Sequence, residues 1–370
     1  MSDVRQSLGR YDDFEVFAVR TLEGLDLDRL VPMMDRAWKL DYAGEARQTF
    51  GHEVLKKLLR GDGWIAVLAC TGEGAPIGVE LALERQLAVG DRTLRTYYVT
   101  VFSVCPDHRR KGVGRRVLEG INRMVFEEEG AELIHSTFHE GYAGSPTVQS
   151  TFDPIEDFAV CRYHASPIWS RRLDKDPLPP LNRALRVSRA WCSSSTTEQL
   201  TLGPCGSAHP VNFKAPSIVE LNEWVRSEFS VGFLFESSLR SQYLGEDGSQ
   251  SGLLFYEFGG GGRAALTYNL MPMKIDDHPL KPVGQIQTVM TRGCAESHKQ
   301  RLLHHAALYL RSLGCFAATT LDLAAVPTAV LRALGFRPLE EDLVHLAARG
   351  PAETVALFED EAPPFFVDFT

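Results

Sequence analysis

The order of hydrophobic and polar residues in the first half of the chain predicts alternating strands and helices. β-Branched and aromatic residues run through 96–104, which predicts a buried strand. A turn with two glycines follows. After it, apolar residues recur at helical spacing while charged residues occupy the opposite face; the apolar set is Val117, Leu118, Ile121, Met124 and Val125. The unit is therefore a strand, a glycine-containing turn and an amphipathic helix.

Further elements are predicted on both sides of this unit. The predicted strands are 14–21, 64–70, 76–86 and 131–138, and the predicted helices are 27–38 and 52–60. A closing hairpin is expected over 158–169. The fold class is α/β, with a mixed twisted sheet flanked by helices.

The second half repeats the helical pattern of the first at a constant spacing of 185 residues, with the apolar set Leu302, Leu303, Ala306, Tyr309 and Leu310. A strand is predicted before it at 283–290, another after it at 316–321, and a helix at 327–334. We therefore expect a duplicated fold; an unrelated α/β domain is the alternative.

This duplication sets the predicted domain limits. An N-terminal domain is expected over 1–170, a linker rich in proline and serine over 171–205, a C-terminal domain over 206–350, and an acidic and aromatic tail over 351–370. The tail is either disordered or a segment that docks on a partner subunit, so a homodimer is one hypothesis.

Composition agrees with a protein of two cores and excludes several classes. The 370 residues are 44% hydrophobic and 24% charged, which suits a globular chain with more than one core. The formal net charge of −9 argues against sequence-independent binding of nucleic acid. No long apolar run predicts a membrane span and no signal segment is recognised, so we expect a cytoplasmic protein that binds no membrane.

Cysteine and histidine spacing gives no reason to expect a metal. The seven cysteines are scattered and never spaced as C-x-x-C, which disfavours both a disulfide framework and a structural zinc site. The histidines, including His304 and His305, form no ligand cluster with carboxylates at a recognised spacing. We expect reduced thiols and no bound metal.

The glycine-containing turn has the composition of an anion-binding site. Gly112 and Gly114 leave room for backbone N–H groups to approach a ligand, and the following helix directs its positive dipole end to the same place. Neither a P-loop nor the G-x-G-x-x-G dinucleotide fingerprint is present, because Val117 stands where the third glycine belongs. The alternative is an ordinary strand-to-helix connection with solvated arginines.

Residues 104–118, VCPDHRRKGVGRRVL, resemble the acetyl-CoA-binding motif of the GNAT N-acyltransferase superfamily, whose pattern is [RQ]-x-x-G-x-[GA]. Arg109, Gly112 and Gly114 match that pattern, and the two halves together resemble a tandem GNAT arrangement. The resemblance implies acetyl-CoA or another acyl-CoA as co-substrate. It implies that Phe102 and Val104 pair with the pantetheine arm, and that the pyrophosphate is held by the backbone of Arg109, Arg110, Lys111, Gly112, Val113, Gly114 and Arg115.

The second copy lacks this motif. Its equivalent turn reads Cys294-Ala295-Glu296-Ser297-His298-Lys299, with an added carboxylate and no paired glycines, which opposes pyrophosphate binding. We expect the second domain to be a degenerate copy that shapes or caps the first domain or mediates dimerisation.

The catalytic candidates lie on and after the strand at 131–138, since the positions where GNAT members carry Glu or His hold Tyr98 and Thr100. His135, Thr137 and His139 share one strand face, and Tyr142 follows. His139 and Tyr142 are the preferred acid–base residues, because a neutral imidazole suits proton removal near pH 7, and Tyr98 offers a second hydroxyl. Glu80 and Glu84 are further candidates; for each residue a structural role is the alternative.

Two classes of function follow. The first is an enzyme that transfers an acyl group, most simply acetyl, from CoA to the amine of a small molecule or peptide by direct attack on the thioester. The second is a non-catalytic or regulatory acyl-CoA-binding protein. A longer acyl-CoA or an acyl carrier protein is an alternative donor.

Overall fold

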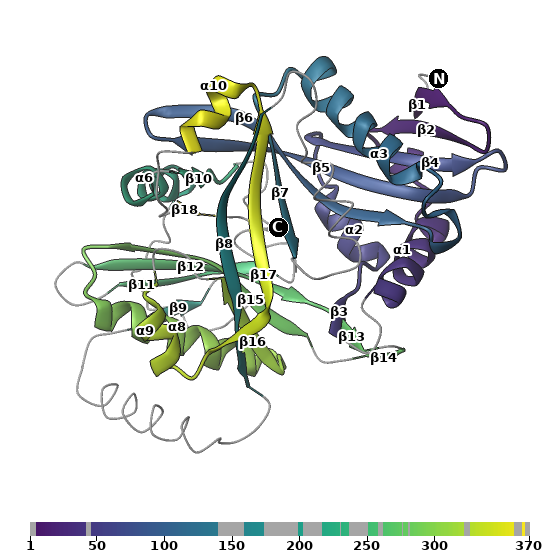
Figure 1. Ribbon diagram of the computed structural model, residues 1–370. Helices are drawn as coiled ribbons and strands as arrows, with labels where there is room; N and C mark the ends of the chain where they lie inside the picture. The colour runs from purple at the N-terminus through teal and green to yellow at the C-terminus, as the bar shows by residue number, and fades with distance from the viewer. Residues whose placement is uncertain are drawn as a thin grey trace.

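In the computed structural model, strands from both halves of the chain join one continuous sheet (Figure 1). The structure describes residues 5–41, 46–139, 159–173, 199–202, 217–229, 231–236, 251–257, 262–275, 277–279, 282–321, 326–358 and 365–366. Tyr142, most of the predicted linker and most of the predicted tail lie outside these residues.

The first half contains the predicted strands and helices in the order that the hydrophobic pattern indicates, with additional strands at its start and between its first two α-helices. Its elements are β1 (Arg5–Arg10), β2 (Phe14–Val19), the 3-10 helix η1 (Leu22–Gly24), α1 (Leu27–Asp41), β3 (Ala46–Gln48), α2 (His52–Leu58), β4 (Trp64–Thr71), β5 (Pro76–Val89), β6 (Arg92–Val104), the 3-10 helix η2 (Pro106–His108), α3 (Val113–Asn122), the π-helix η3 (Arg123–Glu128), β7 (Leu133–His139) and β8 (Ala159–Arg172).

The second half repeats the central part of this order, in which three strands of the main sheet are followed by a helix and a further strand, with additional short elements inserted. Its elements are β9 (Gln199–Leu202), α6 (Ile218–Glu228), β10 (Val231–Phe233), β11 (Ser251–Glu257), β12 (Arg263–Met271), β13 (Met273–Ile275), β14 (His278–Pro279), β15 (Val283–Arg292), α8 (Glu296–Ser312), β16 (Ala317–Leu321), α9 (Thr328–Ala333), β17 (Arg337–Gly350), α10 (Ala352–Val355), the 3-10 helix η5 (Ala356–Phe358) and β18 (Phe365–Phe366).

The strand order of the sheet is nearly symmetric about its centre. Along the main path it runs β1-β2-β4-β5-β6-β7-β17-β8-β16-β15-β12-β11-β9. Inward from each edge, the two halves place equivalent strands in the same order, and both β6–β7 and β15–β16 are parallel pairs. The chain therefore contains two GNAT-like halves, as the repeat predicts.

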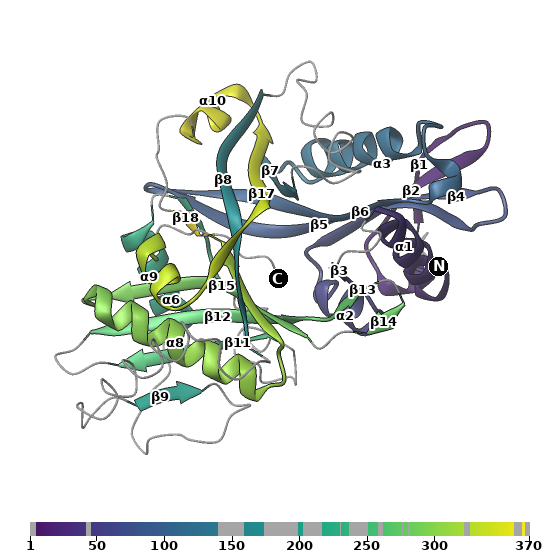
Figure 2. The ribbon, with the colours of Figure 1, turned by 60° about the horizontal axis from the view of Figure 1, so that its bottom comes forward.

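The two halves exchange their last strands at this centre. β17 of the second half pairs with β7, and β8 of the first half pairs with β16. β8 and β17 also pair with each other, as the two long strands that join the halves in Figure 2. The hairpin expected over 158–169 is wrong: this segment is part of one continuous strand, because the position beside β7 is filled by β17 rather than by a returning neighbour.

Smaller contacts repeat this exchange. β3 of the first half pairs with β13 of the second, and β10 of the second half pairs with the end of β5. The predicted domain limits stay a prediction, and strands reach into the expected linker from both sides, since β8 ends at Arg172 and β9 begins at Gln199. Within 351–370, the described Val355 and Phe358 are buried in the same chain.

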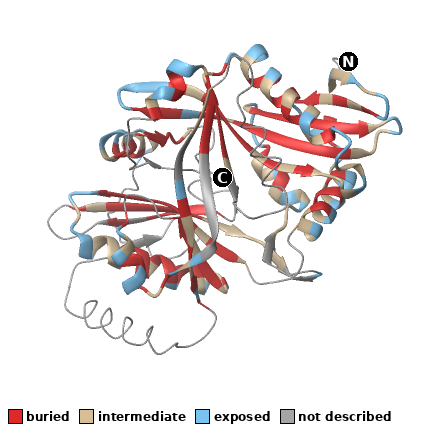
Figure 3. Ribbon diagram, viewed as in Figure 1, coloured by how far each residue is buried: buried red, intermediate tan, exposed pale blue. Residues whose placement is uncertain are grey.

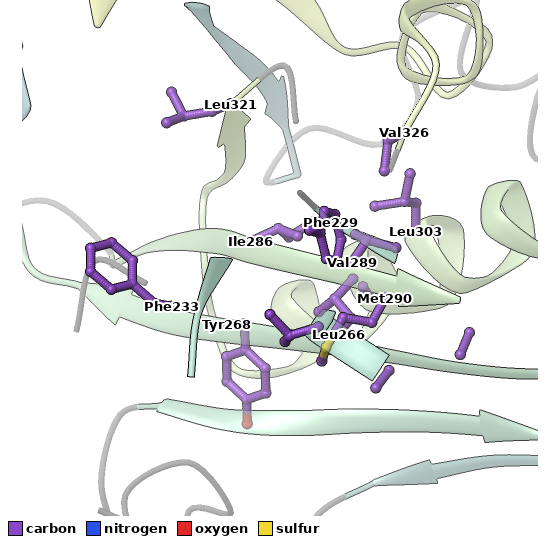
Figure 4. Packing of buried hydrophobic residues seen from close by; sticks show 14 of the residues in the cluster. Phe229, Phe233, Leu266, Tyr268, Ile286, Val289, Met290, Leu303, Leu321 and Val326 are labelled. Atoms are coloured by element: carbon purple, nitrogen blue, oxygen red, sulfur yellow. The ribbon is translucent and has the colours of Figure 1, made fainter. Parts of the chain in front are cut away.

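Most residues on the central strands of the first half are buried, as the red strands in Figure 3 show. One core cluster lies between the sheet and α3, and another between the sheet and the helices α1 and α2. The second half and the interface between the halves share one larger cluster, part of which is shown in Figure 4. No described helix has the length and apolar character needed to cross a membrane.

Candidate acyl-CoA site

The first half has a gap in its sheet where two parallel strands part. β6 and β7 are paired from Thr96 with Leu133 to Val99 with Ser136, and the pairing stops there although both strands continue. Just beyond this point β6 carries a bulge, with Val101 at a φ of 61° and a register shift opposite Val79–Leu81. A bulge bends its strand and increases the local twist, so β6 turns away from β7.

The turn after β6 ends at the N-terminus of α3. Arg110 and Gly112 adopt left-handed backbone conformations, with φ of 62° and 82°. Gly112 is the N-cap residue and no side chain caps the helix there. The first N–H groups of a helix have no partner within it, so the amides of Val113, Gly114 and Arg115 are available to an anion.

The positive charges of this turn differ in what they contact. Arg110 and Lys111 are exposed and form no ion pair with a described residue. Arg115 and Arg116 each bind Glu119, at 2.8 Å and 2.6 Å, and Arg116 also lies 4.8 Å from the ring centre of Tyr11. Arg110 and Lys111 are therefore the side chains best placed to add charge at the turn.

Arg109, the first residue of the matching motif, is directed toward α1. Its two Nη atoms donate to the carboxylate of Asp41 at 2.6 Å and 2.9 Å, and Nη2 also donates to the carbonyl of Ala37 at 3.3 Å. Its Nε donates to the carbonyl of Val104 at 3.3 Å. The side chain thus fixes the turn to the end of α1, and the backbone N–H of Arg109 donates to the carbonyl of Pro106 at 3.3 Å, so the amides that follow Arg109 are the ones left to face a ligand.

Of the predicted catalytic residues, Tyr98 is the one whose side chain the structure describes. Its hydroxyl is 2.7 Å from Oγ1 of Thr137, which joins β6 and β7 just where their backbone pairing ends. His139 is the last residue of β7 and is paired with Val344 of β17; nothing further is described of its side chain. The structure therefore places Tyr98 and the end of β7 at the same gap.

His135, on the same strand as His139, is enclosed by residues of the second half. Its ring lies 5.4 Å from that of Phe233 and 5.6 Å from that of Phe358. Burial lowers the pKa of His135 to about 3, so the imidazole is neutral at pH 7. Sequence reasoning gave no sign of this enclosure, because both aromatic residues are distant in the chain.

The two glutamates of β5 have different surroundings. Glu84 pairs with Arg95 at 2.7 Å. Glu80 lies beside the bulge, is 4% exposed, and its Oε2 has no hydrogen-bond partner. Burial raises the pKa of Glu80 to about 8, and the positive charge of Arg349 has an opposing effect. Arg349 lies on β17, and the sequence alone did not indicate that it is near Glu80.

The equivalent turn in the second half differs from the first in its charge and in its hydrogen bonds. α8 begins at Glu296, which places an acidic residue in its first turn. The amide of Ala295 donates to Nδ1 of His298 at 3.2 Å, and Cys294 donates its thiol to the carbonyl of Arg263. His298 thus binds the N-cap amide and Glu296 places a carboxylate at this helix N-terminus, and both features oppose an anion there.

A strand that parts from its parallel neighbour just before a glycine-containing turn and a helix is the arrangement of the GNAT fold. This chain has that fold in two halves, with the open helix N-terminus in the first.

The comparisons with known proteins agree on the fold. One structure of N-myristoyltransferase from Saccharomyces cerevisiae with bound myristoyl-CoA is 13% identical, with a TM-score of 0.66 over 94% of this chain and 80% of that one. Another has a TM-score of 0.64 over 94% of this chain and 85% of that one. A GCN5-related glucosamine N-acetyltransferase region of a fungal GH3 β-N-acetylglucosaminidase is 14% identical, with a TM-score of 0.56 over 92% of this chain and 38% of that one. No protein-family model and no curated protein matches the sequence.

Proposed function

We propose that the first half transfers an acyl group from acyl-CoA to the amine of a small molecule or peptide. One observation carries this proposal: the uncapped N-terminus of α3, with Arg110 and Gly112 in left-handed conformations, lies directly after the strand that parts from β7. The arrangement offers amides and positive charge to a pyrophosphate, and it offers a strand edge to an extended pantetheine arm.

The binding residues follow from that geometry. The backbone from Arg109 to Arg115 would hold the pyrophosphate, with the side chains of Arg110 and Lys111 adding charge. Phe102 and Val104 lie beyond the last β6–β7 pair and are half-buried. Their strand edge would pair with the pantetheine arm as an added strand does.

The reaction needs a base for the amine and an acid for the thiolate. The amine nitrogen attacks the thioester carbonyl carbon, a C–N bond forms and the C–S bond breaks. His139 would accept the proton of the attacking amine, and the hydroxyl of Tyr142 or Tyr98 would protonate the departing sulfur. Tyr98 is supported by its hydrogen bond to Thr137 at the gap.

Acetyl is the simplest donor group. A longer acyl chain is the second candidate, and one observation favours it: the structure with bound myristoyl-CoA is similar to this chain over 94% of its length, across both halves. An acyl carrier protein remains an alternative carrier of the same thioester.

The proposal is tested by measuring thiol release from acetyl-, octanoyl- and myristoyl-CoA with a panel of small amines and peptides. Turnover with one donor identifies the acyl chain, and loss of turnover in a Gly112→Asp variant assigns it to the first half. A stable CoA complex without turnover on any amine would instead support the alternative of a non-catalytic acyl-CoA-binding protein.

A further inference from the structure

A second group of positive and polar side chains lies beneath α8, in the half that lacks the open turn. Its centre is Arg171 on β8, paired with Ala318 of β16 and only 4% exposed. The Nε and Nη1 atoms of Arg171 have no hydrogen-bond partner. Trp169, two residues earlier and so on the same strand face, is 2% exposed, and its indole N–H has no acceptor.

α8 adds further donors and charge to this group. His304 is 5% exposed and its Nδ1 has no partner. Burial, then the charge of Arg171, lowers the pKa of His304 to about 4, so its imidazole is neutral at pH 7 and donates one hydrogen bond. Burial and the nearby Arg311 lower the pKa of Arg171 to about 10, which leaves it charged at pH 7.

The first half contains a comparable buried arginine whose polar neighbours can be compared with those of Arg171. Arg349 is on β17, the strand that the second half contributes in exchange for β8, and it is 3% exposed. It donates to the side-chain oxygen of Asn122 on α3 at 3.2 Å, and the carboxyl group of Glu80, which its raised pKa keeps largely protonated at pH 7, lies near enough for that pKa to be affected by the Arg349 charge. Among the described residues, no carboxylate and no amide oxygen serves Arg171 in this way.

A buried guanidinium keeps its proton and is costly to bury without a compensating negative charge. Among the described residues, the group beneath α8 thus has several buried donor atoms that no acceptor satisfies. We propose that Arg171, His304 and Trp169 form a binding site for a small oxyanion, of the carboxylate or phosphate type. The ligand has to be small, because the Arg171 side chain is nearly closed off from solvent.

The test is isothermal titration of the full chain, at low salt, with inorganic phosphate in one series and acetate in another. The first-half turn is itself an anion site, so the titrations use a Gly112→Asp background as well as the wild-type chain. We expect saturable binding of at least one anion in both, and the stronger of the two series identifies the anion type.

The matched pair of variants is Arg171→Met and Arg172→Met. Arg172 is the next residue of β8 and is exposed, so its replacement should leave binding unchanged. Replacement of Arg171 should weaken binding by about tenfold or more, because charge-assisted hydrogen bonds to the anion are lost. His304→Leu, a smaller change, should weaken it by a few-fold and serves if Arg171→Met does not fold. Equal binding by the Arg171 or His304 variant and the wild-type chain, or no saturable binding by the wild-type chain, would overturn the proposal.

Discussion

Arg109 and Asp41 form a two-point contact, at 2.6 Å and 2.9 Å, that ties the turn before α3 to the last residue of α1. Bidentate contacts of this kind fix geometry as well as adding energy. The contact is partly buried, with 32% of the Arg109 and 15% of the Asp41 side chain exposed. We infer that it sets the position of the turn on which the amides and the charges of Arg110 and Lys111 depend.

The Arg109–Asp41 contact predicts that the two residues act as one unit. Arg109→Lys and Asp41→Asn should each weaken CoA binding several-fold, since a lysine cannot make the two-point contact. The double variant should lose no more than either single variant, because both remove the same interaction. Calorimetric titration with CoA measures all four proteins. Additive losses would show that Arg109 contacts CoA independently of Asp41.

The left-handed conformation and open surroundings of Gly112 predict the effect of a charge placed there. Gly112→Asp should abolish measurable CoA binding, because a carboxylate at the helix N-terminus opposes the pyrophosphate. The matched control is Gly74→Asp: Gly74 also has a positive φ, of 76°, with nothing within 4 Å of an added Cβ. The control shares the backbone strain but lies in the β4–β5 turn. If the CoA affinity of Gly112→Asp is unchanged, CoA does not bind at this turn.

The hydroxyl of Tyr98 predicts a catalytic effect separate from packing. Tyr98→Phe keeps the ring and should lower kcat by about 10²-fold, the range of a lost acid–base group, with little change in KM for acyl-CoA. Tyr97→Phe is the control, because Tyr97 is the preceding residue and packs in the core on the α3 side. If kcat is unchanged in Tyr98→Phe, the tyrosine is structural and Tyr142 becomes the remaining acid.

The buried carboxyl group of Glu80 predicts a pH dependence of stability. Burial raises its pKa from 4.5 to about 8, so the folded protein holds a proton that the unfolded chain releases at lower pH. The stability from this proton is complete below pH 4.5 and is lost as the pH rises through about 8. Glutamine mimics the neutral form of Glu80 at every pH. The free energy of unfolding of Glu80→Gln, relative to that of the wild-type chain, should therefore be higher at pH 8 than at pH 4.5.

Thermal unfolding across that pH range measures the effect of Glu80. Glu53→Gln is the control, since the Glu53 side chain is 88% exposed on α2. A constant difference between the Glu80 variant and the wild-type chain at all pH values would mean that Glu80 is ionised in the fold.

The close approach of β17 to β7 predicts a cost for a methyl group at Gly350. An added Cβ there lies 2.6 Å from the carbonyl oxygen of Glu132, a backbone atom. Gly350→Ala should lower the free energy of unfolding by about 1–3 kcal/mol, the usual cost of overpacking. Gly51→Ala is the matched control, because nothing lies within 4 Å of its added Cβ. Chemical denaturation measures the free energy of unfolding of both variants. Equal values would show that β17 and β7 move apart to accept the methyl group without loss of stability.

The parts of the fold set by local sequence were predicted well. Residues 104–118 carry a strand end, a turn and a helix start within one short segment, and the structure places each where the pattern indicates. The spacing of 185 residues predicted α8 and β16 in the same way.

Contacts between distant segments were not predictable from local patterns. A strand pattern states which residues face inward but not which strand lies beside it, so a hairpin was predicted over 158–169, where β8 is a single strand, and β17 was not expected beside β7. The enclosure of His135 by Phe233 and Phe358 was missed for the same reason. Arg109 was expected at the ligand from its motif, and its partner Asp41 lies 68 residues away.

The exchange of β8 and β17 also determines how this protein can be divided and how it folds. A chain cut between the halves would leave β7 without β17 and β16 without β8, and each unpaired edge would be a template for aggregation. Neither half completes its sheet until residues more than a hundred positions apart have met, which is a slow step in folding. We therefore expect the two halves to unfold as one unit, and we expect the first half to complete its sheet only after the second half has been synthesised.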